Sequence, residues 1–181
     1  AVQPNPGGTF GDFTEVTPSD SIFVTPQEED FWVITTAPAD YDSDGDLDIV
    51  LCGLYIPTDN KLMETDFRYS EIHKNNGDGT FSKIDDQLIK VSDGSLDWGD
   101  YDNDGDADVY ISANGFKNYL FRNDTKKGSN KMKFTNVTKT AGVQGPESSF
   151  PCWFFDFDND GWLDIMNFSY SANISDNDIP A

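Results

Sequence analysis

One stretch of nine residues organises the chain, and it reads Asp100-Tyr101-Asp102-Asn103-Asp104-Gly105-Asp106-Ala107-Asp108. Two further copies of this stretch occur at residues 40–48 and 156–164. All three copies fit the pattern Asp-x-Asp-x-Asp-Gly-x-x-Asp, and each has an aromatic residue at its second position. The chain is rich in acidic residues, with 33 Asp and Glu, but composition alone does not produce three copies with the same fixed positions.

The carboxylates at positions one, three and five of each copy converge only if the backbone curls around a common centre, where they would repel one another. A hard cation relieves this repulsion, and calcium accepts roughly six to eight oxygen ligands in flexible geometry, whereas magnesium prefers a tighter octahedron. The glycine at position six permits the turn, position seven offers its carbonyl, and the Asp at position nine completes the shell. The sequence therefore predicts about three bound Ca²⁺ ions. The predicted ligands are Asp40, Asp42, Asp44, Asp46, Asp48, Asp100, Asp102, Asp104, Asp106, Asp108, Asp156, Asp158, Asp160, Trp162 and Asp164.

The EF-hand is the nearest alternative, but its loop needs a bidentate Glu at position twelve and helices on both sides. Position twelve is Leu51, Ile111 or Asn167 in the three copies, and none of these side chains can replace that Glu. The residues that follow each copy are rich in β-branched and aromatic types, which favour strands over an exit helix.

The pattern around each copy predicts short antiparallel strands. In the first repeat they are residues 31–36, 49–56, 69–74 and 80–84, with a hairpin turn at 75–79 that is rich in Asn and Gly. In the second repeat they are residues 95–99, 109–112, 119–122 and 133–138, and in the third they are 152–155 and 165–170. The copies begin 60 and 56 residues apart, from 40 to 100 and from 100 to 156. Four strands in a period of this length are typical of a β-propeller blade.

The fold class predicted is thus all-β, with blades of four antiparallel strands that carry calcium loops. The predicted divisions are an irregular lead with one orphan outer strand (1–30), a blade with the first calcium loop (31–94), a blade with the second (95–146) and a partial blade with the third (147–181). These add up to about three blades, whereas propellers usually have about four to eight. Two interpretations follow: the chain is a segment of a larger propeller, or several copies complete the sheets between them.

Two motifs resemble a known repeat family. Asp97-Trp98-Gly99 directly before the second copy, together with the hydrophobic strand after it, resembles the FG-GAP or VCBS repeat of integrin-α-type β-propellers. The segments 134–138 and 141–143 are similar to repeats found beside ASPIC/UnbV segments in secreted proteins. The resemblance covers nearly the whole chain, and it implies a calcium-binding propeller scaffold more than a particular activity.

The net charge of the chain limits the classes of partner that it can bind. The formal net charge is −21, and three calcium ions would leave about −15, which argues against nucleic acid and anionic membranes because phosphate binding needs clustered Lys and Arg. No apolar run approaches the roughly 20 residues that span a bilayer, so membrane insertion is not expected. The chain begins at Ala1, as a mature or excised segment does. Sites built from several carboxylates are most useful where calcium is plentiful, which favours a secreted, extracellular or cell-surface location.

Other reactive residues are few. Cys52 and Cys152 lie in different repeats, so buried free thiols are preferred over a disulfide. His73 is the only histidine, and a packed or surface imidazole is the preferred interpretation. Trp98 and Trp153 are expected to pack between blades, whereas Trp162 lies within a loop and is the most exposed candidate for a sugar-binding platform.

The function predicted is a calcium-binding extracellular β-propeller module for protein or glycan binding, adhesion or assembly with copies of itself. Two alternatives remain open: a segment of a secreted polysaccharide-acting enzyme, and a structural subunit of a calcium-dependent filament. No catalytic residue is predicted, because calcium binding accounts for the paired carboxylates before acid-base chemistry does.

Overall fold

The structure is a computed structural model that describes residues 29–57, 68–84, 88–91, 93–127 and 131–169. Within these ranges the chain forms ten strands and one four-residue helix, so the all-β prediction is confirmed. Residues 1–28, which hold most of the predicted lead and its outer strand, lie outside the described residues. No helix in the described ranges is both long enough and apolar enough to cross a membrane.

The first sheet has four antiparallel strands in the order β1-β2-β3-β4. Its strands are β1 (Glu29–Ala39), β2 (Asp48–Pro57), β3 (Arg68–Asn75) and β4 (Phe81–Ile84). The predicted hairpin joins β3 to β4, and the Asn76 N–H donates to the Thr80 carbonyl across it at 3.0 Å. Gly77 and Gly79 have φ of 74° and 86°, which side chains resist, so these two glycines set where the chain reverses.

The second sheet repeats this arrangement in the order β5-β6-β7-β8. Its strands are β5 (Gly94–Gly99), β6 (Asp108–Ala113), β7 (Tyr119–Asn123) and β8 (Phe134–Asn136). The helix α1 (Thr138–Ala141) follows β8 and ends at Gly142, whose φ of 76° suits a residue without a side chain. A third sheet pairs β9 (Ser149–Phe155) with β10 (Asp164–Ser169).

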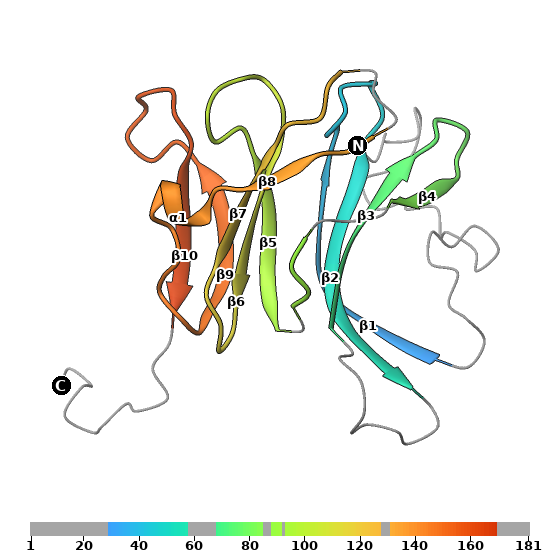
Figure 1. The fold of residues 1–181 in the computed structure, drawn as a ribbon, viewed down its shortest axis with the longest axis horizontal. Helices are drawn as coiled ribbons and strands as arrows, with labels where there is room; N and C mark the ends of the chain where they lie inside the picture. The colour runs from blue at the N-terminus through green and yellow to red at the C-terminus, as the bar shows by residue number, and fades with distance from the viewer. Residues whose placement is uncertain (1–28, 58–67, 85–87, 92, 128–130, 170–181) are drawn as a thin grey trace, which may run out of the picture.

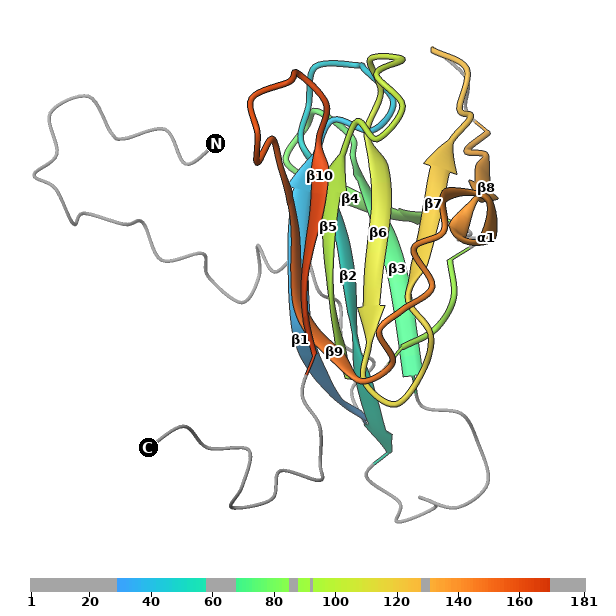
Figure 2. The ribbon, with the colours of Figure 1, turned by 90° about the vertical axis from the view of Figure 1, so that its left-hand side faces the viewer.

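The three sheets stand side by side, and each carries one Asp-rich loop between its first two strands (Figures 1 and 2). We name these connections loop 1 (residues 40–48), loop 2 (100–108) and loop 3 (156–164). All three project from the same end of the molecule, at the top of Figure 1. The stack of sheets thus places three copies of one motif in one row.

A first core fills the space between the first two sheets. Val50 and Cys52 of β2 and Val109 and Ile111 of β6 belong to this core, and all four side chains are buried. The members of each pair are two residues apart because side chains alternate between the two faces of a strand.

Trp98 of β5 belongs to the same core and confirms the prediction that it packs between sheets. Its ring stacks on Tyr41 of loop 1 with the centroids 6.2 Å apart, and its Nε1–H donates to the Ala37 carbonyl at 2.9 Å. One side chain of the second sheet therefore contacts both the end of β1 and the start of loop 1.

A second core lies between the second and third sheets. Tyr110 of β6 meets Phe154 of β9 edge to face, with 6.3 Å between ring centroids. Gly99 allows this approach, because a Cβ at that position would overlap the Phe154 ring. All six residues of β6 are buried, since sheets cover both of its faces.

The third sheet corrects one expectation. Trp153 is not packed between two sheets of the described chain: it is 38% exposed and contacts Phe168 of the neighbouring strand, with ring centroids 5.4 Å apart. The reason is strand alternation, since Cys152 and Phe154 point to the second core and Trp153 points the other way. In the described residues no further sheet covers that outer face. Trp162 is 53% exposed, as predicted.

The cysteines follow the preferred interpretation. Cys52 and Cys152 are both free and both buried, on the two sides of the second sheet. Burial raises the pKa of the Cys52 thiol to about 12, so this group remains protonated at neutral pH.

Candidate metal centres in three equivalent loops

The first Asp of each loop holds the turn together. In loop 2 the Asp100 carboxylate accepts the backbone N–H groups of Asp104 and Gly105, each at 3.0 Å. Asp40 accepts the corresponding two N–H groups in loop 1 at 3.0 Å, and Asp156 does so in loop 3 at 3.0 and 3.1 Å. The shared hydrogen bonds show that the repeated sequence pattern produces one repeated backbone conformation.

The residue at position four takes part in this turn, which the sequence reasoning missed. Ser43, Asn103 and Asn159 have φ of 58°, 56° and 60°, in the left-handed region that few side chains accept. Asn tolerates this region better than most residues, and its presence in two of the three copies was the available signal. The glycine at position six has φ between 90° and 101° in all three loops, as the pattern predicted.

In loops 1 and 2 the ninth Asp joins the loop to its sheet. Asp108 is fully buried, and its two carboxylate oxygens accept the N–H groups of Tyr101 at 2.8 Å and Asn123 at 2.7 Å. Asp48 is also fully buried and accepts the N–H groups of Tyr41 at 3.3 Å and Asn75 at 2.8 Å.

Asn75 and Asn123 end the third strand of their sheets and were not predicted to serve the loops. Both follow a basic residue, Lys74 or Arg122, and this shared basic-Asn pair was the signal that could have identified them. Asn123 also bridges two sheets, because its Nδ2 donates to the Tyr41 carbonyl of loop 1 at 2.8 Å.

The side chains at positions one, three and nine converge in every loop. Within each trio the ligand atoms lie within 4.8 Å of one another. The trios are Asp40, Asp42 and Asp48; Asp100, Asp102 and Asp108; and Asp156, Asp158 and Asp164. Positions five and seven lie outside these trios: Asp44 Oδ2 is 2.6 Å from Lys74 Nζ, and Asp104 Oδ1 accepts the Asp106 N–H at 3.2 Å. The role of these residues as metal ligands stays a prediction.

Crowding and burial make these carboxylates unfavourable as anions. Burial raises the pKa of Asp48 and of Asp108 to about 6. Burial, followed by the charge of Asp104, raises the pKa of Asp106 to about 7. At neutral pH the folded protein therefore holds negative charge that nothing in loop 2 neutralises, and a cation would lower its free energy.

Three carboxylate oxygens are buried without a hydrogen-bond donor among the described residues: Asp42 Oδ1, Asp102 Oδ1 and Asp106 Oδ1. An unpaired buried polar atom is costly, by about 1–3 kcal/mol and more for a charged group. A hard divalent cation is a natural partner for such atoms, because calcium is bound by carboxylate and carbonyl oxygens at about 2.3–2.6 Å. The donor set of loops 1 and 2 thus fits calcium.

His73 is not part of any of these centres. It lies on β3, and its Nε2 is 3.1 Å from Glu71 Oε2 on the same strand. Its side chain is only partly exposed, which agrees with the expected packed or surface imidazole.

A family model matches the segment that contains Asp97-Trp98-Gly99 and the second copy of the motif, on which the resemblance was based. The model of an FG-GAP-like repeat matches residues 62–111, a segment that contains β3, β4, β5 and the whole of loop 2. The predicted relation to FG-GAP-type repeats is therefore confirmed for this segment. No curated protein and no solved structure gave a significant match to the chain.

Proposed function

Since residues 62–111 are an FG-GAP-like repeat, we propose that this protein is a calcium-binding module of the β-propeller type that binds a protein or glycan partner outside the cell. One observation carries the proposal: the same trio of carboxylates converges in three loops at one end of three stacked sheets. Calcium would neutralise each trio and hold the loops in the conformation that the partner meets.

The choice of calcium rests on the ligands and on charge. Loops 1 and 2 each contain five carboxylates and loop 3 contains four, a density that suits an ion with many oxygen ligands. Magnesium would keep several waters and needs only one or two carboxylates, so it would leave most of these charges uncompensated. A site of this kind works where calcium is abundant, which supports the extracellular location.

Exposed aromatic rings beside loop 3 support the binding role. Phe157 and Trp162 of the loop are 71% and 53% exposed, and Trp153 and Phe168 lie on the outer face of the same sheet. Exposed aromatic clusters are typical of surfaces that meet proteins or sugars, because a flat ring buries much area at little entropic cost. We propose that the partner binds at the third sheet, beside loop 3.

The proposal predicts about three calcium ions per chain, measured by equilibrium dialysis with elemental analysis of the protein. Each of the double variants D42N/D44N, D102N/D104N and D158N/D160N is expected to lose one ion, because each removes two charges from one loop. The matched control is D78N/E147Q, which removes two exposed carboxylates outside the loops and should keep all the ions. A wild-type protein that binds no calcium would disprove the proposal.

Self-assembly is a second candidate, and the outer face of the third sheet favours it. Trp153, Phe155 and Phe168 occupy that face, and a second copy could cover it as the second sheet covers β9. If assembly is the function, light scattering in millimolar calcium will give a defined multiple of 20.2 kDa, and the variant W153S/F168S will return to the monomer mass. A wild-type monomer both in calcium and in chelator would remove this candidate and leave partner binding.

A further inference from the structure

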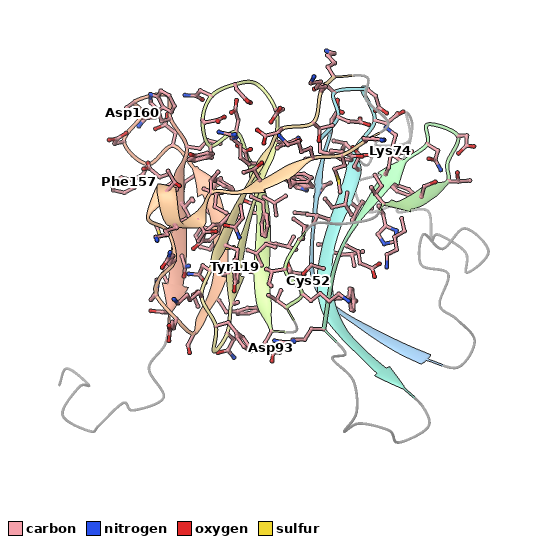
Figure 3. The ribbon with its side chains drawn as sticks, viewed as in Figure 1. Cys52, Lys74, Asp93, Tyr119, Phe157 and Asp160 are labelled. Carbon is pink, nitrogen blue, oxygen red and sulfur yellow. The ribbon has the colours of Figure 1, made fainter. Side chains whose placement is uncertain are left out.

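Loop 1 differs from the other two loops in having a cation of its own. The Lys74 ammonium, at the end of β3, contacts Asp42 Oδ2 and lies 2.6 Å from Asp44 Oδ2. These two carboxylates are positions three and five of the loop, so Lys74 neutralises part of the charge that calcium would neutralise. Figure 3 shows Lys74 at the end of the molecule that carries the three loops.

The equivalent residue of the second sheet forms its ion pair outside the loop, although its charge still acts on Asp102. Asn75 and Asn123 donate the same hydrogen bond to the ninth Asp of their loops, so Arg122 corresponds to Lys74. Arg122 Nε donates instead to Asp124 Oδ1 at 2.9 Å, and this is the ion pair that it makes among the described residues. Loop 2 therefore has no cation in direct contact with its carboxylates among the described residues, and Asp102 Oδ1 and Asp106 Oδ1 are buried without a donor there.

Loop 3 also lacks such a cation among the described residues. None of the ion pairs found in the described ranges involves Asp156, Asp158, Asp160 or Asp164. Its trio is also more exposed than the other two, so water screens its charges. The three loops thus share a backbone conformation but differ in what balances their charge.

We infer that Lys74 is a tethered counter-ion of loop 1 that competes with calcium there, so that loop 2 fills at a lower calcium concentration than loop 1. This inference rests on the proposed calcium-binding function. Calcium must displace the ammonium from Asp42 and Asp44 before it can use both carboxylates. Displacement remains feasible, because the Asp42 side chain is 8% exposed and its second oxygen, Oδ1, is buried without a donor from the described residues.

The arrangement gives a graded response to calcium. Lys74 holds loop 1 against β3 when calcium is scarce, whereas loop 2 depends on the ion for its charge balance. At higher concentrations calcium replaces the ammonium and loop 1 reaches the same bound form as loop 2. The class of ligand is the same at both loops, and only the concentration range differs.

Loop-specific NMR tests this directly, because each loop has one glycine at position six: Gly45, Gly105 and Gly161. Their amide signals are followed in ¹H–¹⁵N spectra as calcium is added to the wild type, K74Q and K83Q. In the wild type Gly105 should respond at a lower calcium concentration than Gly45. K74Q should lower the midpoint of Gly45 by about tenfold or more, because removal of one charge a few ångströms away changes the affinity by at least this order.

K83Q is the matched control, since Lys83 of the adjacent strand pairs with Glu71 and not with the loop. It should leave all midpoints unchanged. K74R keeps the charge and should keep Gly45 at the wild-type midpoint, which also protects the test if K74Q unfolds. An unchanged or higher Gly45 midpoint in K74Q would overturn the inference while Gly105 still reports calcium binding. If no glycine responds in the wild type, the proposed function fails and the inference fails with it.

Discussion

Removal of calcium with excess EDTA is expected to lower the melting temperature by about 5–10 °C for each ion lost. A ligand present at about 100 times its dissociation constant adds about 2.7 kcal/mol to the free energy of unfolding. In a chain of this size about 1 kcal/mol moves the melting temperature by about 2–4 °C. We expect calcium to bind the folded chain and not the unfolded one, because only the folded chain brings each trio of carboxylates within 4.8 Å. Differential scanning calorimetry in millimolar calcium and in EDTA measures the difference.

The same difference should shrink as the pH falls from about 8 to about 5. Burial raises the pKa of Asp48, Asp106 and Asp108 to between about 6 and 7 in the folded chain, above the ordinary value of an unfolded Asp. Above pH 7 these groups are charged, and they destabilise the calcium-free protein. As the pH falls through their folded pKa values they take up protons and this cost disappears, so the calcium-free protein gains stability.

Protons also compete with calcium for the same oxygens, so the stability that calcium adds to the folded protein decreases as the pH falls from about 8 to about 5. Carboxyls with lowered pKa values, such as Asp124 at about 2, lose their stabilising effect only below this range. The variant D106N should reduce the pH dependence, because it removes the group with the highest of these values. Equal melting temperatures in calcium and in EDTA at pH 8 would contradict the mechanism.

The loops were predictable because their information is local. Nine residues contain the carboxylate that binds the N–H groups four and five positions later, the glycine that turns the chain and the Asp that closes it. The strands were predictable for a related reason, since the residues after Asp48, Asp108 and Asp164, which lean toward β-branched and aromatic types, form β2, β6 and β10. Both features depend on residues within a few positions of each other.

Features that depend on distant residues were not predictable. Lys74 lies 30 residues after Asp44, and a sequence cannot say whether its ammonium or that of another lysine reaches the loop. The hydrogen bonds from Asn75 and Asn123 to the ninth Asp use backbone groups, which any residue offers. Trp153 was assigned to the wrong environment because the pattern of a strand shows two faces but not what covers each one.

Replacement of Trp98 by alanine tests the contact between the first two sheets, and we expect W98A to destabilise the protein by about 3–5 kcal/mol. Trp98 is 9% exposed and fills the space between Tyr41 and Phe134. Its ring stacks on that of Tyr41 and is tilted against that of Phe134, with 6.2 Å between ring centroids in both pairs. Alanine would leave a cavity there, and the Ala37 carbonyl would lose its donor. The melting temperature should fall by about 6–20 °C, measured by circular dichroism in millimolar calcium.

The matched control is W162A, which removes an exposed tryptophan and should change the free energy of unfolding by no more than about 0.5 kcal/mol. W98A should also weaken calcium binding at loop 1, because Tyr41 contacts Trp98 through its ring and Asp48 through its N–H. The NMR midpoint of Gly45 should therefore rise in W98A while that of Gly161 stays the same. If W98A melts at the same temperature as the wild type, the contact between the first two sheets does not depend on Trp98. The ring contact between Trp98 and Tyr41 then cannot be what holds loop 1 in place.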